Sequence, residues 1–508
     1  MPFSKYFTIF LKTALFMFFC ISQSGSVYAD SKGAARHFDK ILNQSASLRL
    51  FLQDFPKGAD LHSHLSGVIY AENFIKWAAK DGKCVDLASH AIAFPPCDSA
   101  QGRPSVKSIE NNDSIVNGII DAFSTRNYER RPVSGHDQFF ATFMRFSAAG
   151  AGRQGHMIAE ATARAALQNI LYLELMQSNG MGDARALAAN DESFKSATKL
   201  EDLIKNKAMN KIVDDAILTT DQSEKDWKAT LKCQDNAENP GCKTEVRYLA
   251  QVIRTFPPEQ VLAQTILAYK LIEKDPRYVG LNFVAPEDHP VTLRDHRLQM
   301  EIIRDVGNHF PATNISLHAG ELTLGLVPPE DLKSHINEAI HIAGARRIGH
   351  GIDIAYETQA QDLLNHMSEN NIMVEINLTS NDVILGVKGD DHPFSLYRAN
   401  NVPMALSTDD EGVSRIDLTH EYMRAARTYD LSYRDLKNFS RNALEYSFLE
   451  GNSLFQAPGS QKTVKACAKD QPKKNFLSKG CHLYLEKNKK AMMQWELEKR
   501  FVAFEKRF

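Results

Sequence analysis

The feature that most limits the fold of this chain is an alternation of short apolar, strand-like segments with longer helical ones. Stretches such as Leu293–Val306 and Leu332–Ala343 have helical apolar spacing. Eight strand candidates can be identified: the segment entering His62, Leu171–Leu175, Val246–Ile253, Val279–Val284, Asn314–Leu317, Arg347–Ile348, Ile372–Ile376 and Val402–Leu406. From the fifth to the eighth they recur at about 30 residues, the length of one βα unit. We therefore predict an α/β protein whose parallel sheet closes into a (β/α)8 TIM barrel.

Two intervals are too long for a plain βα unit, and they predict loop insertions at about residues 80–135 and 180–243. A C-terminal extension covers about residues 450–508 and ends in Leu483–Phe508, for which we predict one charged, amphipathic helix. No repeat or low-complexity linker divides the chain, so we expect one decorated barrel domain over residues 30–508. An open doubly wound sheet is the alternative. It is disfavoured because no glycine-rich phosphate loop follows the first strand.

Residues 1–29 have the pattern of a secretory signal peptide. Lys5 and Lys12 precede the apolar run Ala14–Ile21, and Ala29 is the small residue that a signal peptidase requires. The run is too short to span a bilayer as a helix. We expect cleavage after Ala29 and a secreted or periplasmic protein with no membrane attachment afterwards.

The cysteines agree with an oxidising compartment, and the charge balance argues against a nucleic-acid partner. After loss of Cys20 six cysteines remain, and pairing neighbours closes three short loops: Cys84–Cys97, Cys233–Cys242 and Cys467–Cys481. Free thiols are the alternative. Lys and Arg number 60 against 62 Asp and Glu, so the sequence lacks the basic footprint of a nucleic-acid-binding protein.

Four motifs place histidines and carboxylates at the ends of predicted strands. They are Asp60–His64 (DLHSH), His318–Glu321 (HAGE), Gly349–Gly351 (GHG) and Ser407–Asp410 (STDD). Each alone also fits a structural role, such as a core histidine, a glycine turn or a helix-capping aspartate. Together they follow the first, fifth, sixth and eighth strands, where barrel enzymes carry their active sites. Three neutral imidazoles and one carboxylate form a good zinc site with one position left for water.

With these motifs the chain resembles the adenosine deaminase family of metal-dependent amidohydrolases, including its secreted, growth-factor-like branch. The similarity runs from about residue 57 to 450. The matching segments are Ala59–Gly67, Phe139–Phe146, Leu171–Met176, Gly280–Asp288, Leu317–Glu321, Arg347–Gly351, Thr379–Asn381, His392–Phe394, Ser407–Asp410 and Arg441–Leu449.

The resemblance implies zinc-dependent hydrolytic deamination of adenosine and 2′-deoxyadenosine to inosine and deoxyinosine, with release of ammonia. It implies one zinc ion per chain, with these ligands: His62, His64, His318 and Asp409. By the same resemblance, Glu321 protonates ring nitrogen 1 of the purine, His350 orients the attacking water, and Asp410 holds nitrogen 7. The partner is then a small purine nucleoside, and a homodimer remains open.

Two positions depart from the family pattern. Ala285 stands where a glycine usually offers its backbone N–H to purine nitrogen 3. Ser66 replaces an aspartate that meets the ribose 5′ hydroxyl in adenosine-specific members. Serine is a weaker acceptor and does not repel a phosphate. A deaminase of adenine or of adenosine nucleotides therefore remains an alternative, and Arg145 is a distant basic residue that could reach such a site.

A binding or growth-factor-like extracellular protein with a decayed site is the alternative from another class. The complete set of expected ligands and catalytic side chains argues against it. Two further features are interpreted as solvated surface: the helix face of His335, Glu338 and His341, which lacks the zinc-protease spacing, and the basic run Lys487–Lys490. Binding of a heparin-like polyanion to the basic tail is the alternative for the second.

Overall fold

The computed structural model describes residues 31–196, 199–236, 238–474 and 476–508. The predicted signal peptide, residues 1–29, lies outside the described residues. All eight predicted barrel strands are present, with bounds that agree or differ by one or two residues. They are β1 (Gly58–His64), β4 (Ile170–Gln177), β5 (Glu245–Ile253), β6 (Tyr278–Val284), β7 (Ser316–Ala319), β8 (Arg347–His350), β9 (Met373–Ile376) and β10 (Met404–Leu406).

The eight strands close into a ring. They pair in parallel as two four-stranded sheets, in the orders β1-β4-β5-β6 and β10-β9-β8-β7. A parallel bridge between Ser63 and Asp409 joins β1 to the end of β10, and a bridge between Leu281 and Ile315 joins β6 to the entrance of β7. The predicted (β/α)8 barrel is confirmed.

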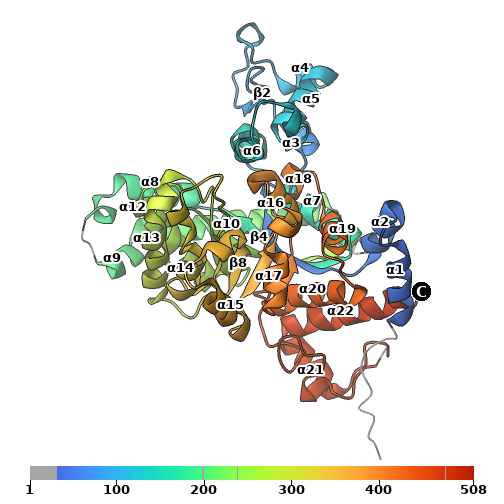
Figure 1. Cartoon of the computed structure of the whole chain (residues 1–508). Helices are drawn as coiled ribbons and strands as arrows, with labels where there is room; N and C mark the ends of the chain where they lie inside the picture. The colour runs from blue at the N-terminus through green and yellow to red at the C-terminus, as the bar shows by residue number, and fades with distance from the viewer. Residues whose placement is uncertain (1–30, 197–198, 237, 475) are drawn as a thin grey trace, which may run out of the picture.

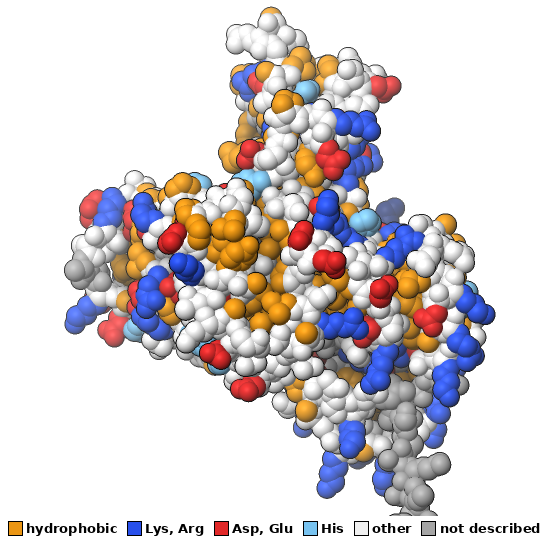
Figure 2. Space-filling model, viewed as in Figure 1, with side chains coloured by type: hydrophobic (Ala, Val, Ile, Leu, Met, Phe, Trp, Pro, Cys, Tyr) orange, Lys and Arg blue, Asp and Glu red, His pale blue; other side chains and the backbone are white. Residues whose placement is uncertain are grey.

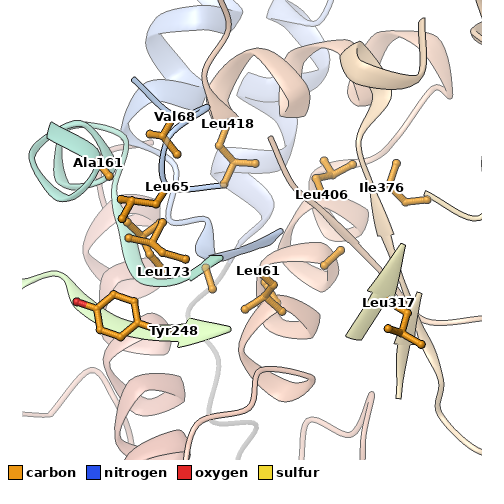
Figure 3. Close-up of a cluster of buried hydrophobic side chains, with 14 of the residues drawn as sticks. Leu61, Leu65, Val68, Ala161, Leu173, Tyr248, Leu317, Ile376, Leu406 and Leu418 are labelled. Carbon is orange, nitrogen blue, oxygen red and sulfur yellow. The ribbon is translucent and has the colours of Figure 1, made fainter. Parts of the chain in front are cut away.

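Helices cover the outside of the ring (Figure 1). Leu61 and Leu317 each precede an inward-facing histidine, so they point to the opposite face of their strands and pack in the buried cluster drawn in Figure 3. The covering helices are α7 (Gln154–Leu167), α8 (Met181–Asn190), α12 (Pro258–Lys274), α13 (Pro290–Gly307), α14 (His335–His341), α15 (Ala360–Glu369), α17 (Phe394–Ala399), α19 (Leu418–Thr428) and α20 (Tyr433–Glu445). The short helices α16 (Leu378–Leu385) and α18 (Glu411–Ser414) lie instead at the top of the barrel, against α6 (Gly135–Gly150).

The segment between α3 (Ala71–Lys80) and α6 (Gly135–Gly150) rises from the barrel as a narrow projection, at the top of Figure 1. Figure 2 shows side chains of both charges scattered over the visible face of the projection and of the body. The projection contains β2 (Cys84–Val85), β3 (Ile92–Ala93), α4 (Val106–Ile109) and α5 (Asp113–Ala122). β2 and β3 form an antiparallel ribbon that was not predicted, because strands of two residues carry no periodicity.

The second long segment is helical, and the C-terminal extension differs from the prediction. The former contains α9 (Leu200–Ile204), α10 (Lys207–Thr230) and α11 (Pro240–Lys243). The single helix expected over residues 483–508 is wrong. The chain forms α21 (Lys479–Lys487) and α22 (Lys489–Glu505), because Asn488 adopts an extended conformation between them.

Helix α22 packs against α20 through two ion pairs, Lys437–Glu505 at 2.6 Å and Arg441–Glu498 at 2.7 Å. The N-terminal helices α1 (Lys32–Ile41) and α2 (Ser45–Asp54) lie at the same end of the barrel (Figure 1). Lys490, predicted to be solvated, is half-buried and donates to the carbonyl of Glu445 at 3.0 Å.

The three predicted disulfides are confirmed as Cys84–Cys97, Cys233–Cys242 and Cys467–Cys481. Within the described ranges no helix combines the length and the apolar character needed to cross a membrane.

Candidate metal centre

Four predicted ligands converge at the carboxyl ends of β1, β7 and β10. Nε2 of His318 lies 3.1 Å from Nε2 of His62 and 3.2 Å from Nε2 of His64. Oδ1 of Asp409 lies 3.4 Å from Nε2 of His62 and 3.1 Å from Nε2 of His64. Nitrogen and oxygen ligands lie about 2.0–2.1 Å from zinc, which puts tetrahedral ligands about 3.3 Å apart. The spacing of the four atoms therefore fits a metal ion of that size.

The protonation of the three imidazoles also fits a metal. Each Nδ1 faces an oxygen acceptor: Glu375 Oε2 at 2.6 Å for His62, Gln251 Oε1 at 2.9 Å for His64 and Asn282 Oδ1 at 2.7 Å for His318. Because these oxygens accept, each ring carries its proton on Nδ1 and directs the Nε2 lone pair at the centre. Two facing Nε2 lone pairs cannot form a hydrogen bond, so a cation between them accounts for their close approach.

A chain of buried ion pairs inside the barrel orients His62. Glu375 accepts from Ser316 Oγ at 2.9 Å and pairs with Arg347 Nε at 2.6 Å, and Arg347 in turn pairs with Glu174 at 2.7 Å. The three charged side chains are fully buried, where a charge is tolerated only with partners. The sequence alone assigned no role to these residues, although Glu174 and Arg347 lie in the matching segments Leu171–Met176 and Arg347–Gly351.

His350 lies among the ligands but carries its proton on the other nitrogen. The backbone N–H of Phe394 donates to His392 Nδ1 at 3.0 Å, and His392 Nε2 donates to Asn381 Oδ1 at 3.2 Å. The amide Nδ2 of Asn381 then donates to His350 Nδ1 at 2.9 Å, which leaves the proton of His350 on Nε2. Nε2 is buried and has no partner among the described residues. His350 is thus arranged as a hydrogen-bond donor rather than a fifth ligand.

Burial keeps this chain of groups neutral. It lowers the pKa of His350 and that of His392 to about 3 each. Neither ring then carries a second proton at neutral pH, so each has one donor and one acceptor nitrogen and the chain of hydrogen bonds runs in a single direction. Asn381 and His392 lie in the matching segments Thr379–Asn381 and His392–Phe394, and only their three-dimensional contacts reveal this role.

Two carboxyl groups complete the centre. Burial, reinforced by Asp409, raises the pKa of Glu321 and that of Asp410 well above the usual range. Oε1 of Glu321 and Oδ1 of Asp410 are buried without a hydrogen-bond partner in the described parts of the chain. Both residues line a cavity of about 370 Å³ that also contacts His64 and His318. An acid with a raised pKa in a cavity beside a metal site is a candidate proton donor.

Glycines leave room for these groups. A Cβ atom at Gly67 would lie 1.4 Å from Oδ1 of Asp410, and one at Gly349 would lie 2.5 Å from Cε1 of His62. No side chain can replace either hydrogen without displacing a site residue, so the motifs HLSG and GHG require glycine here.

Three site residues have strained backbones. The φ angles of Ala285, His350 and Asp409 are +87°, +69° and +59°, in the left-handed region that disfavours residues with a Cβ atom. For Ala285 this explains why a glycine is usual at the position. Ala285 lines the same cavity as Glu321, and its contact with the substrate stays a prediction.

The loop that carries Glu321 is held by Glu287 and Arg254. Glu287 Oε1 accepts from the backbone N–H of Gly320 at 3.0 Å, and Oε2 accepts from that of Glu321 at 2.8 Å. Arg254 donates to the carbonyls of Ala285 at 3.1 Å and His318 at 3.0 Å. Neither residue was singled out from the sequence, although Glu287 stands in the motif GLNFVAPED.

His335 corrects a prediction. It was expected on a solvated helix face, but it is buried and its Nδ1 lies 2.6 Å from Glu287 Oε1. Its ring stacks on that of His296 with centroids 3.7 Å apart, and His296 Nδ1 lies 3.0 Å from Oε2 of Glu338. His335 and Glu338 face α13 and the loop after β6, whereas His341 is exposed, as predicted.

The two other predicted positions lie beside the centre. Ser66 is half-buried and lines a second cavity next to the first. Arg145 donates to the carbonyl of Ala122 at 3.1 Å and to Gln138 at 3.3 Å, and it lines neither cavity.

Comparison with known proteins agrees with the fold and the motifs. The fold is similar to that of an adenine deaminase from Arthrobacter aurescens, with a TM-score of 0.51 and 16% identity over 78% of this chain and 94% of that one. The three histidines and one aspartate lie at the carboxyl ends of the barrel strands, the face where barrel enzymes carry their active sites.

Residues 222–454 match the model of the adenosine deaminase family. It is 30% identical over 185 residues to an adenosine deaminase of Clostridium perfringens, which is 35% of this chain and 51% of the relative. It is 32% identical over 208 residues to one of Pectobacterium atrosepticum, which is 41% and 56%. The matched part spans about half the length of these relatives.

Proposed function

We propose that the protein is a zinc-dependent deaminase that converts adenosine and 2′-deoxyadenosine to inosine and deoxyinosine. The observation that carries this proposal is the convergence of the four predicted ligand atoms beside a cavity that is also lined by Glu321, a carboxyl of raised pKa. A bound zinc ion would lower the pKa of a water molecule towards about 7 and make it nucleophilic at neutral pH.

The residues of the chain supply the proton transfers. Glu321 donates its proton to ring nitrogen 1, which makes carbon 6 electrophilic. The Nε2–H of His350 orients the oxygen that adds to carbon 6, and Asp410, protonated because its pKa is raised, donates to nitrogen 7. The amino group takes up a proton and leaves as ammonia. One water is consumed, and the oxygen remains on carbon 6 of inosine.

The same groups argue against a binding protein with a decayed site. Recognition of a ligand alone does not require Glu321 beside a metal, nor a histidine whose tautomer is fixed by three further residues. The three disulfides favour an oxidising compartment, which supports our proposal that the mature protein is secreted or periplasmic.

Activity can be tested on zinc-loaded protein by following the absorbance of adenosine and the release of ammonia in parallel. We expect both to proceed with equal stoichiometry and to stop after chelation, returning when zinc is added. If no purine is deaminated by protein that retains one zinc ion per chain, the proposal is wrong.

A further inference from the structure

A second cavity adjoins the metal centre. It measures about 380 Å³ beside about 370 Å³ for the first, and both are lined by Phe143, Gln251 and Ile253. Leu65 and Ser66, which directly follow the ligand His64, line the second cavity. Each is as large as a typical small-molecule site. A substrate held in the first cavity can therefore extend into the second.

The second cavity is uncharged and partly apolar. Six of its lining side chains are large and apolar: Leu65, Phe143, Phe146, Met157, Met176 and Ile253. Its polar lining consists of serine, asparagine and glutamine, and none of the described residues that line it is Lys, Arg, Asp or Glu. Such a surface favours a neutral group with apolar atoms over an ion.

A phosphate would find little stabilisation here. It needs a cationic partner, whereas the first cavity contributes the carboxyl groups of Glu321, Asp409 and Asp410. Helix α7 begins at Gln154 on the cavity wall, but a helix end supplies only about half a positive charge. The neighbouring Arg153 is engaged with Asp81.

We propose that the second cavity binds an uncharged, partly apolar substituent at the 5′ position of the nucleoside. The substrates then include adenosine analogues whose 5′ hydroxyl is replaced by a group such as an alkylthio chain. Met157, Met176 and the two phenylalanines would pack on such a group, and the short side chain of Ser66 leaves room for it. This inference rests on the proposed deamination.

The first test compares catalytic efficiency on one zinc-loaded preparation for adenosine, 5′-deoxy-5′-methylthioadenosine and adenosine 5′-phosphate. We expect the methylthio analogue to be used within about tenfold of adenosine, because neutral atoms replace a hydroxyl in a mixed cavity. The phosphate should be at least about 100-fold poorer, because an uncompensated charge costs several kcal/mol.

A variant that fills the second cavity tests whether the 5′ substituent binds there. Ser147 is exposed on α6, lines the cavity and donates its hydroxyl to the carbonyl three residues earlier. Ser147→Phe should lower kcat/KM for the methylthio analogue by about tenfold or more through overpacking, and that for adenosine by less than about threefold. Ser108→Phe is a matched control, because Ser108 has the same hydrogen bond on an exposed helix of the projection.

Binding provides a readout that needs no turnover. Calorimetry should give similar affinities of the wild-type protein for inosine and 5′-deoxy-5′-methylthioinosine, and Ser147→Phe should weaken only the second. Preference for the 5′-phosphate, or equal losses for both nucleosides in Ser147→Phe, would overturn the inference. If no purine is deaminated but the methylthio product binds and Ser147→Phe abolishes that binding, the proposed reaction fails and the cavity assignment stands. If the methylthio product does not bind, the assignment itself fails.

Discussion

The backbone N–H of Glu321 donates a 2.8 Å hydrogen bond to the buried carboxylate of Glu287. The other oxygen of that carboxylate accepts from Gly320 and from His335. Both carboxylate oxygens of Glu287 therefore hold the loop on which the proposed proton donor lies, and this makes Glu287 a positioning residue.

We expect Glu287→Gln to lower kcat by about 10- to 100-fold, because it removes a charge-assisted acceptor worth about 1.5–3 kcal/mol. Zinc content and KM should change little, since Glu287 touches neither ligand atoms nor the cavity. Glu338→Gln, which alters the far side of His296, should stay within about threefold of wild type. A wild-type kcat for Glu287→Gln would exclude the positioning role.

Glu321→Gln should leave zinc content and folding nearly intact while turnover collapses. The amide cannot deliver a proton to ring nitrogen 1, and general acid catalysis contributes about 10²- to 10⁴-fold. Steady-state kinetics with metal analysis on the same sample measure both quantities. Activity within a few fold of wild type would remove Glu321 from the mechanism.

His318→Ala should lose zinc and activity together, because it deletes one of the four converging ligand atoms. His309→Ala serves as the control, since His309 is exposed just after the end of α13 and is not among the converging site residues. Metal analysis after dialysis against a chelator gives the result. One tightly held zinc ion per chain in His318→Ala would show that the ligand set is wrong.

Asn381→Asp should reverse the tautomer of His350. A carboxylate accepts from both neighbouring histidines, so the proton of His350 would move to Nδ1 and its Nε2 lone pair would face the metal centre. We expect a fall in kcat of at least about tenfold. The absorption spectrum of cobalt-substituted protein should change as well, because a fourth imidazole becomes available. An unchanged spectrum together with normal kcat would contradict the proposed hydrogen-bond chain.

Stability should fall on acidification through His296. Burial, with repulsion from His335, lowers the pKa of His296 from 6.5 to about 4. Between these values the unfolded chain binds a proton that the folded chain does not, so the free energy of unfolding decreases as the pH falls. The full effect is on the order of 3 kcal/mol. Urea unfolding at pH 7.5 and pH 5 should show it, and His296→Phe should reduce the slope.

Much of this protein is determined by local sequence. Strands β1 and β4–β10 could be located from short apolar segments, and the histidine and aspartate motifs directly follow or end these segments. Because side chains alternate along a strand, His62 and His64 could be placed on the same face. The disulfides follow as well, since neighbouring cysteines close short loops at low entropic cost. All of these inferences use contacts close in sequence or a fixed period.

Tertiary structure alone decided which atoms meet. The sequence does not reveal that Asn381 and His392 make His350 a hydrogen-bond donor. Nor does it reveal that His62, His64 and His318 are oriented as ligands by the oxygens of Glu375, Gln251 and Asn282. In each case the histidine and its partner lie many residues apart. Nor does it show that His335 turns inward to Glu287, since helical spacing gives the relation of residues on one helix but not the face that is covered. Hydrogen-bond direction and burial depend on distant segments brought together by the closed barrel, and a linear pattern carries no information on either.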